Sequence, residues 1–264
     1  ISNFTQNFER DMRYKNYADS SINNYVCQVK MFLHHFSKKD SPKHISSDDL
    51  KNYILNFKEV NSQRHMHSAI KLFYTLTIHQ PQKFSFIKYA RKNKKLPQVI
   101  DKDFLLECIS KIDNIKHKAI ISLAFSVGLR VSEVINLKIS DIDSKRMLIT
   151  VRQAKGNKDR IVPLSQTILV LLRDYFNEYQ PKEYLFNGQF SNQYSSTSCN
   201  AIVKKYLGND YHFHTLRHSS FTSMLESGTD LRLIQKIAGH TSSKTTEIYT
   251  HVSTQMLNRV QTPI

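Results

Sequence analysis

Residues 214–251 read HTLRHSSFTSMLESGTDLRLIQKIAGHTSSKTTEIYTH, and this stretch gathers the chain's main candidate reactive side chains. If its start is helical, His214, Arg217 and His218 stand three and four positions apart and share one helix face. Two imidazoles and a guanidinium would then lie side by side. Such a group of side chains can bind and act on an anionic substrate.

Further along the stretch, Gly239 is expected to end the next helical segment, because glycine readily adopts the left-handed conformation that closes a helix. His240 follows at the turn, where its side chain can point into a cleft. Tyr249 stands nine residues later. Imidazoles, a guanidinium and a phenol can together attack a phosphodiester without a metal ion, so these residues are candidates for an active site.

The chain carries a large positive charge. Among its 264 residues, 38 Lys and Arg against 22 Asp and Glu give a formal net charge of +16. Residues 1–95 hold 17 basic and 7 acidic residues, and residues 96–264 hold 21 and 15. This excess favours a polyanionic partner, nucleic acid first and an acidic membrane surface second. A basic protein without such a partner is the plainer alternative.

Composition also argues against several classes of protein. No apolar run approaches 18 residues and residues 1–20 do not resemble a secretion signal, so we expect neither a membrane span nor export. Cys27, Cys108 and Cys199 have no disulfide or metal spacing, which fits a reducing cytoplasm. The twelve histidines lack partners at zinc-ligand spacing, and the six glycines form no phosphate-binding loop. The sequence predicts no metal and no cofactor.

Apolar residues at helical spacing predict four helices in the first part of the chain, at about 4–17, 20–37, 46–57 and 63–77. Ser20 and Ser21 are the predicted cap of the second helix. The four helices would form a bundle domain over residues 1–90, with their aromatic stripes as its core. The basic run Arg91–Pro97 indicates a linker over residues 91–98, either solvated or lying along a phosphate backbone.

The pattern restarts after the linker and predicts a second domain over residues 99–264. Helices are expected at about 102–111, 115–127, 131–137, 165–179, 194–207, 214–227, 231–238 and 243–250. Two β-branched runs, Met147–Val151 and Arg160–Pro163, flank Lys155–Asp159 and predict a hairpin. The expected fold class is mainly α with a small β-sheet or hairpin (α+β), in which a helical bundle precedes a mixed α/β domain.

Five motifs occur together in this chain: Gly128-Leu-Arg-Val-Ser-Glu133, Lys155-Gly-Asn-Lys-Asp-Arg-Ile-Val-Pro-Leu164, His214-x-Leu-Arg-His218, Gly239-His240 and Ile248-Tyr-Thr-His251. In their order and spacing the chain resembles the tyrosine recombinases, the phage integrase family, in its simple two-domain form. The predicted bundle and linker resemble the family's core-binding domain. The resemblance implies a site-specific DNA recombinase or integrase that cuts and rejoins strands through a covalent 3′-phosphotyrosine, without metal or nucleotide.

The resemblance also implies catalytic roles. Arg130 and Arg217 would hold the non-bridging phosphate oxygens, because guanidinium groups stay charged and match phosphate geometry. Tyr249 would be the nucleophile, and a phenol, which titrates at about pH 10, needs a base or nearby cations. His214 is the candidate general base, and His240 is expected to hydrogen-bond the phosphate.

The remaining site residues have supporting roles. Lys155, at the predicted hairpin tip, would protonate the departing 5′-oxygen, with Lys158 as an alternative. Glu133 would help to orient the cluster, and His218 is expected to be a helix-packing residue more than a reactant. Three positions depart from the proline, glycine and leucine that are frequent in the family, and none removes a reacting group: Phe213, Ala154 and Ala238.

The implied partner is double-stranded DNA at recombination sites, bound by a homo-oligomer that ranges from a dimer to a tetramer. Binding should weaken steeply with salt, because most contacts would be to phosphates. We expect a cytoplasmic, nucleoid-associated protein. The side chains predicted to bind DNA are Lys92, Lys94, Lys95, Lys158, Arg160 and Lys244.

Two other functions stay open on the sequence alone. A type IB topoisomerase uses similar chemistry to relax DNA, although the His-x-Leu-Arg-His motif and the first domain favour a recombinase. A catalytically silent DNA-binding protein of the same fold is the second alternative, although every expected reacting side chain is present.

Overall fold

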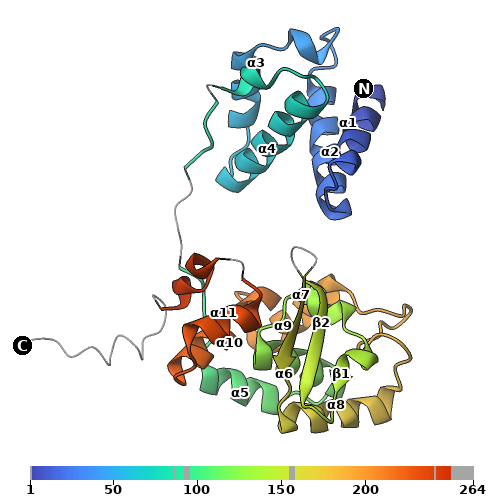
Figure 1. The fold of residues 1–264 in the computed structure, drawn as a ribbon, viewed down its shortest axis with the longest axis vertical. Coiled ribbons are helices and arrows are strands. Elements are labelled where there is room, and N and C mark those ends of the chain that lie inside the picture. Colours follow the sequence, from blue (N-terminus) through green and yellow to red (C-terminus); the bar gives the residue numbers. More distant parts are fainter. Residues whose placement is uncertain (1, 86, 92–95, 155–157, 241, 251–264) are drawn as a thin grey trace, which may run out of the picture. The chain divides into compact units, whose positions relative to one another are not determined.

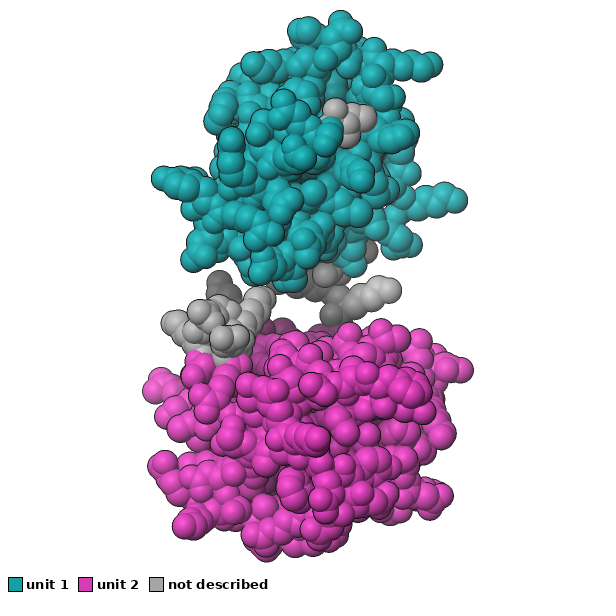
Figure 2. Space-filling view, turned by 90° about the vertical axis from the view of Figure 1, so that its right-hand side faces the viewer, with its two compact units in different colours: residues 1–94 teal, residues 95–264 magenta. Residues whose placement is uncertain are grey.

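The computed structural model describes residues 2–85, 87–91, 96–154, 158–240 and 242–250. The chain divides into two compact units, Ile1–Lys94 and Lys95–Ile264, which are coloured separately in Figure 2. The division falls within the segment 91–98 that the sequence predicts as a linker. Residues 92–95 of that segment lie outside the described residues.

Unit 1 is a bundle of α-helices with two short 3-10 turns, as the apolar spacing predicts. Its elements in chain order are α1 (Ser2–Tyr14), α2 (Asp19–His35), η1 (Pro42–His44), α3 (Ser47–Leu55), α4 (Val60–Leu76) and η2 (Pro81–Phe84). α3 begins with a capping box, in which Ser46 and Asp49 bond to each other's backbone amides. The predicted cap of α2 at Ser20 and Ser21 is wrong. That helix already includes both serines, since it begins directly after Ala18, and it has no side-chain cap.

The aromatic side chains of unit 1 form its core. Phe8, Phe32, Phe73 and Tyr74 are fully buried, and the rings of Phe8 and Phe73 meet edge to face with centroids 5.5 Å apart. The Tyr74 hydroxyl donates to the carbonyl of Pro42 at 2.7 Å, which satisfies the one polar atom of that ring. The prediction that these aromatic stripes pack internally is confirmed.

Unit 2 surrounds one helix, α6 (Ile115–Val127), whose segment after the first turn is buried on all sides. Residues Ala119 to Ala124 of α6 are buried without exception, as expected for a helix with no polar face. α6 packs against α8 (Gln166–Tyr179) and α10 (Phe213–Glu226), as Figure 1 shows. The remaining helices of the unit are α5 (Lys102–Ser110), α7 (Val131–Asn136), α9 (Ser196–Leu207) and α11 (Leu231–Ala238).

A small antiparallel sheet completes unit 2, in the order β1 (Ile142–Asp143), β2 (Leu148–Ala154) and β3 (Lys158–Pro163). β2 and β3 form the predicted hairpin, with Ile149 opposite Val162. β1, preceded by the 3-10 turn η3 (Ile139–Asp141), is absent from the sequence prediction, because two residues are too few to show an alternating pattern. The fold class, mainly helical with a small sheet, is confirmed.

The end of the described chain also differs from the prediction. The stretch 243–250 forms two separate 3-10 turns, η4 (Ser243–Thr245) and η5 (Glu247–Tyr249), instead of one α-helix. α11 ends at Ala238 and is capped by Gly239. The φ of Gly239 is 62°, which is the left-handed conformation expected there. α11 packs against both α10 and β3, so it brings two distant parts of the sequence together.

Gly128 caps α6 under tight packing. Its φ is 64°, and a Cβ atom at this position would lie 2.5 Å from the ring of Phe221 on α10. A side chain here would therefore combine backbone strain with a collision against a buried ring.

We expect Gly128→Ala to lower the free energy of unfolding of unit 2 by about 3 kcal/mol, roughly 1 from the left-handed backbone and the rest from displacement of Phe221. Gly228→Ala is the matched control, because Gly228 also has a positive φ but a Cβ atom there would meet no other atom within 4 Å. It should cost only about 1 kcal/mol. Urea unfolding of the full chain measures both, and equal losses would contradict the proposed collision.

Candidate active site

Arg217 lies at the centre of the cluster of candidate catalytic residues. α10 presents it inward, so that 1% of the residue is exposed. Its guanidinium donates to the Gly128 carbonyl at the end of α6 and, from Nη2 at 2.7 Å, to the Ala238 carbonyl at the end of α11. Burial lowers the pKa of Arg217 to about 10, which keeps it charged at neutral pH. Two helix ends thus hold one cation.

The ring of Phe221 forms an apolar wall of this cluster. The Arg217 guanidinium lies over its face, 4.7 Å from the ring centroid. The centroid of Tyr249 is 5.5 Å away and that of His240 is 6.1 Å away. The sequence analysis did not identify Phe221, although its position one turn after Arg217 on the same helix face is a usable signal.

Arg130 enters the site from the start of α7 and is held by Glu133. The Arg130 backbone amide donates to Glu133 Oε2 at 2.8 Å, and its guanidinium donates to Oε1 at 2.7 Å. The side chain of Arg130 is 19% exposed, whereas that of Glu133 is 4% exposed. Glu133 therefore orients Arg130, as predicted, while Arg130 keeps access to solvent.

Arg160 does not lie where the sequence analysis expects it. Its guanidinium donates to both carboxylate oxygens of Glu133, at 2.7 and 2.8 Å, and its Nε donates to the Ile237 carbonyl at 2.7 Å. Its side chain is 8% exposed. The predicted contact between Arg160 and DNA is therefore corrected. The residue is an internal brace that connects β3 with α7 and α11.

The buried carboxylate of Glu133 stays charged because two guanidinium groups surround it. Burial alone would raise its pKa, but hydrogen bonds and charge attraction from Arg160 and Arg130 outweigh that effect and lower the pKa to about 2. Glu133 thus holds a negative charge that balances the two arginines in the protein interior.

His240 is fixed from both sides. Nε2 lies 3.1 Å from Arg217 Nη2, and Nδ1 lies 2.9 Å from the hydroxyl of Thr246. A guanidinium can only donate, so Nε2 of His240 accepts this hydrogen bond. The proton of the neutral ring is therefore on Nδ1, which donates it to the Thr246 hydroxyl. Burial, with Arg217 and Arg130, lowers the pKa of His240 to about 4. Thr246 is fully buried and is a residue that the sequence analysis missed.

Tyr249 is buried in the same cluster. It lies on η5 with 1% of its surface exposed, and its hydroxyl is 3.2 Å from Nδ1 of His218. Burial raises the pKa of Tyr249 above its ordinary value, while the charges of Arg217 and Arg130 act in the opposite direction. The structure thus brings the candidate nucleophile to the two arginines, but in a form that keeps its proton.

The two histidines of the His-x-x-Arg-His motif share one helix face, as their spacing predicts. The rings of His214 and His218 meet edge to face, 4.6 Å apart. It is His218 that contacts the Tyr249 hydroxyl; the expectation that His218 is a helix-packing residue more than a reactant stays a prediction. His214 is exposed, whereas His218 is half-buried.

Several predicted site residues cannot be placed in the cluster. Lys155, Lys92, Lys94 and Lys95 lie outside the described residues, as does the tail after residue 250. Lys158 belongs to β3 and Lys244 to η4; the structure describes their backbone only. Their predicted roles remain predictions.

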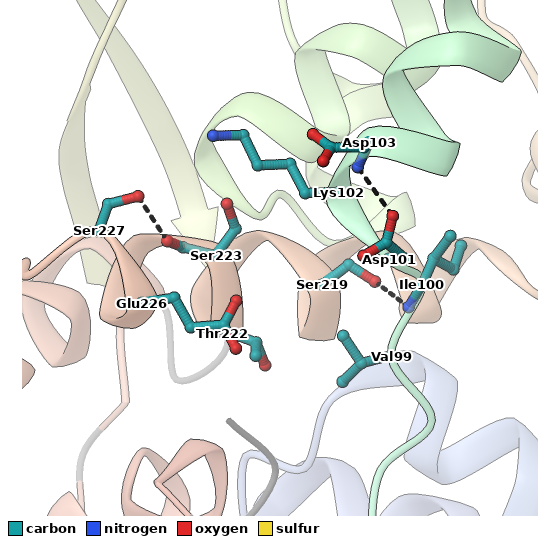
Figure 3. A pocket seen from close by; sticks show the side chains of 10 residues that line it. All are labelled: Val99, Ile100, Asp101, Lys102, Asp103, Ser219, Thr222, Ser223, Glu226 and Ser227. Carbon is teal, nitrogen blue, oxygen red and sulfur yellow. Dashed lines mark hydrogen bonds between the residues drawn. The ribbon is translucent and has the colours of Figure 1, made fainter. Parts of the chain in front are cut away.

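A cavity of about 600 Å³ lies on another face of α10 and is a separate feature (Figure 3). Ser219 and Thr222 line it from α10, and the Ile100 amide donates to the Ser219 hydroxyl at 2.8 Å. None of its lining residues is a predicted catalytic residue. The reactive side chains therefore gather on one face of α10, away from this cavity.

Two further properties of the part of the chain that the structure describes are its groups of potential metal ligands and the lengths of its apolar helices. No group of three or more His, Cys, Asp or Glu side chains there is placed to hold a metal ion. Among the same residues, no helix has both the length and the apolar character to cross a membrane.

The cluster thus brings together two guanidinium groups, three imidazoles and a buried phenol, which are side chains suited to binding and attacking an anionic ester. Comparison with known proteins identifies the class further. Residues 98–256 match the phage integrase family, and residues 4–83 match the phage integrase N-terminal SAM-like domain.

Individual proteins agree with these matches. The putative integrase/recombinase y4qK of Sinorhizobium fredii is 32% identical to this chain, over 98% of it and 87% of the relative. Tyrosine recombinase XerC of Staphylococcus epidermidis is 31% identical, over 93% of this chain and 88% of the relative. The crystal structure of the XerH site-specific recombinase bound to palindromic difH substrate, a post-cleavage complex, has a TM-score of 0.72 at 24% identity, covering 97% and 83% of the two chains.

This chain belongs to the phage integrase family. It is a tyrosine recombinase, an enzyme of site-specific DNA recombination. The resemblance read from the five motifs is confirmed.

Removal of Arg160 should destabilise unit 2 because it leaves a buried carboxylate with one partner in place of two. We expect Arg160→Met to lower the free energy of unfolding by about 3 kcal/mol, and Arg160→Lys to recover only part of it, since an ammonium group cannot bond both oxygens in the same plane. Arg173→Met, at an exposed position of α8, should change stability by less than about 0.5 kcal/mol. Chemical unfolding of the three variants measures these free energies. Similar losses for Arg160→Met and Arg173→Met would contradict the role of Arg160 as an internal brace.

Glu133 should also make stability depend on pH. Its folded pKa of about 2 lies below the ordinary 4.5, so the unfolded state binds more protons between these values. The resulting stabilisation is complete above about pH 4.5 and disappears as pH falls toward 2. It amounts to on the order of 3 kcal/mol.

This effect is measured by comparing the free energies of unfolding of the wild type and Glu133→Gln. The comparison runs from pH 7 to the lowest pH at which both proteins fold. The advantage of the wild type should shrink continuously below pH 4.5, because glutamine does not titrate. A difference that is constant over that range would show that Glu133 has no depressed pKa.

Proposed function

We propose that Tyr249 is the nucleophile of this recombinase and that it forms a covalent 3′-phosphotyrosine with the cleaved DNA strand. The observation that carries this proposal is the placement of its hydroxyl, 3.2 Å from an imidazole nitrogen and in the same cluster as Arg217 and Arg130. A phenolate that attacks phosphorus replaces one phosphodiester with another, so the bond energy is kept for religation.

Arg217 and Arg130 would bind the non-bridging oxygens of the scissile phosphate. A guanidinium has five N–H groups, and the contacts of Arg217 with Gly128, Ala238 and His240 use three of them. Two remain for an anion. Attack adds negative charge to phosphorus, and cations already fixed in place stabilise that charge without reorganisation.

The histidines and Lys155 would complete the reaction. His240 and the exposed His214 lie next to the arginines. His214 is proposed to be the general base, and His240 is proposed to hydrogen-bond the phosphate. For His240 this requires its Nε2 to exchange Arg217 for a phosphate oxygen and to carry a proton. Lys155 is proposed to protonate the 5′-oxygen as it leaves.

The proposed substrate is double-stranded DNA at a recombination site, bound by two or more protomers. The net charge of +16 supports a polyanionic partner, and the related XerH structure is a complex with a palindromic DNA substrate. A palindrome presents the same surface twice, so it suits a symmetric pair of protomers. Sedimentation of the protein on such a duplex counts them. The proposed location follows from the substrate: the cytoplasm, on the nucleoid.

A covalent-trapping experiment tests the nucleophile. Nicked duplexes that tile the DNA on both sides of the encoding gene are incubated with the protein in EDTA and separated on a denaturing gel. We expect an adduct that survives denaturant and disappears after proteolysis. Tyr249→Phe should abolish it completely, because the phenyl ring packs equally well but has no oxygen to attack phosphorus.

Tyr211→Phe is the control, since it removes the hydroxyl of a half-buried tyrosine in the same unit. It should leave adduct formation unchanged. An adduct that persists in Tyr249→Phe would exclude Tyr249 as the nucleophile, and bound duplexes without any adduct would favour a catalytically silent DNA-binding protein.

A further inference from the structure

We infer that Thr246 is a positioning residue for His240, and that its hydroxyl changes from hydrogen-bond acceptor to donor when a substrate phosphate binds. The inference deepens the proposed function, because it rests on the proposed hydrogen bond between His240 and the phosphate. In the structure, Oγ1 of Thr246 lies 2.9 Å from Nδ1 of His240. Thr246 is fully buried, so bulk water does not compete for this contact.

The ring of His240 is held from several directions. The His240 amide donates to the Gln235 carbonyl at 3.1 Å, and the His240 carbonyl accepts from Gln235 Nε2 at 3.3 Å. The ring of Phe221 meets that of His240 edge to face, with centroids 6.1 Å apart. A ring held in this way keeps the same two neighbours in either tautomer, Arg217 at Nε2 and Thr246 at Nδ1.

Thr246 also connects this ring to the turn that carries Tyr249. It follows η4 and precedes η5. Its amide donates to the Ser243 carbonyl at 2.7 Å, and its carbonyl accepts from the Tyr249 amide at 3.1 Å. The two turns that place Tyr249 therefore also hold the Thr246 hydroxyl beside Nδ1 of His240.

The hydrogen-bonding capacity of these groups explains the change of role. A neutral imidazole has one N–H and one lone pair. In the structure the Arg217 guanidinium, which can only donate, uses the lone pair on Nε2, so Nδ1 carries the proton and Thr246 accepts its hydrogen bond. A phosphate oxygen can only accept, so a neutral ring that donates to it from Nε2 has its lone pair on Nδ1. The Thr246 hydroxyl then turns and donates to Nδ1.

A hydroxyl suits this position because other partners would allow only one of the two arrangements. A backbone carbonyl beside Nδ1 would keep the proton there, and a backbone amide would keep it on Nε2. A threonine hydroxyl has one donor hydrogen and two acceptor lone pairs, so it bonds Nδ1 in both tautomers. Protons balance in the exchange, since Nδ1 gives one to solvent and Nε2 takes one up.

The charges around His240 favour this exchange over protonation of the ring. Burial is the largest influence on its pKa, and Arg217 and Arg130 are the next. With smaller contributions from Arg160 and His214, they lower the pKa to about 4. A change of tautomer presents an N–H to the phosphate without placing a further positive charge among these guanidinium groups.

Single-turnover cleavage of a nicked duplex tests whether the hydroxyl has this role. We expect Thr246→Val, which keeps the shape of the side chain, to lower the rate about 10-fold. Thr246→Ser should restore the wild-type rate, because it returns the hydroxyl. Thr245→Val is the matched control at the neighbouring exposed position and should leave the rate unchanged. Equal rates for Thr246→Val and Thr245→Val would overturn the inference.

A double-mutant cycle tests whether Thr246 acts through His240. In His240→Phe, which keeps a ring in the same space, Thr246→Val should cause no further loss of rate, since there is no imidazole left to orient. The same loss in both backgrounds would mean that Thr246 acts only on the packing of Tyr249, which would also overturn the inference.

Nitrogen-15 NMR of the full chain labelled at histidine reads the tautomer directly and requires no Thr246 variant to fold. The signals of His240 are those that His240→Phe lacks. We expect the proton on Nδ1 in the protein alone, and on Nε2 when Tyr249→Phe, which should not cleave, is bound to the duplex. A ring that keeps its proton on Nδ1 in the complex, or that carries two protons, would overturn the exchange.

These outcomes are distinct from a failure of the proposed nucleophile. An adduct that Tyr249→Phe abolishes, together with a normal rate for Thr246→Val, refutes the inference and leaves Tyr249 as the nucleophile. An adduct that persists in Tyr249→Phe refutes the nucleophile, whereas the tautomer of His240 on the bound duplex still decides the role of Thr246.

Discussion

The active cluster depends on the burial of one guanidinium group. Arg217 is 1% exposed, and a charge in that position is tolerated only when hydrogen bonds replace its water. The helix ends at Gly128 and Ala238 supply carbonyl groups that have no partner within their own helices. Arg217 thus satisfies two helix termini while they satisfy it, so the cation that we propose binds the phosphate also joins α6, α10 and α11.

A cluster of three charged side chains, Glu133, Arg130 and Arg160, connects further elements to this buried guanidinium. Glu133 balances Arg130 and Arg160, and Arg160 reaches the last turn of α11 through the Ile237 carbonyl. The strand β3, the short helix α7 and the turn that carries His240 therefore share one network. Because its members are largely buried and bonded in more than one direction, the geometry of the proposed phosphate site is fixed before any substrate binds, which is the condition for electrostatic catalysis.

Much of this architecture is predictable from the sequence, and the exceptions have physical reasons. The apolar run of α6 and the left-handed glycine at residue 239 predict helix and cap correctly, because both are local properties. The inward turn of Arg160 depends on Glu133, 27 positions earlier, and the bond between His218 and Tyr249 spans 31 positions. Thr246 pairs with His240 only because 243–250 forms 3-10 turns and not a regular helix. Such partners arise from tertiary packing, which spacing along one element does not reveal.

Phe221 has a consequence for how this protein can change over evolutionary time. One ring touches the position of Gly128, supports the Arg217 guanidinium and packs beside Tyr249. A larger or smaller residue there would shift the Arg217 guanidinium and the Tyr249 ring together. Variation at residues 128 and 221 should therefore be coupled among descendants of this chain, because a side chain at residue 128 needs a smaller residue at 221.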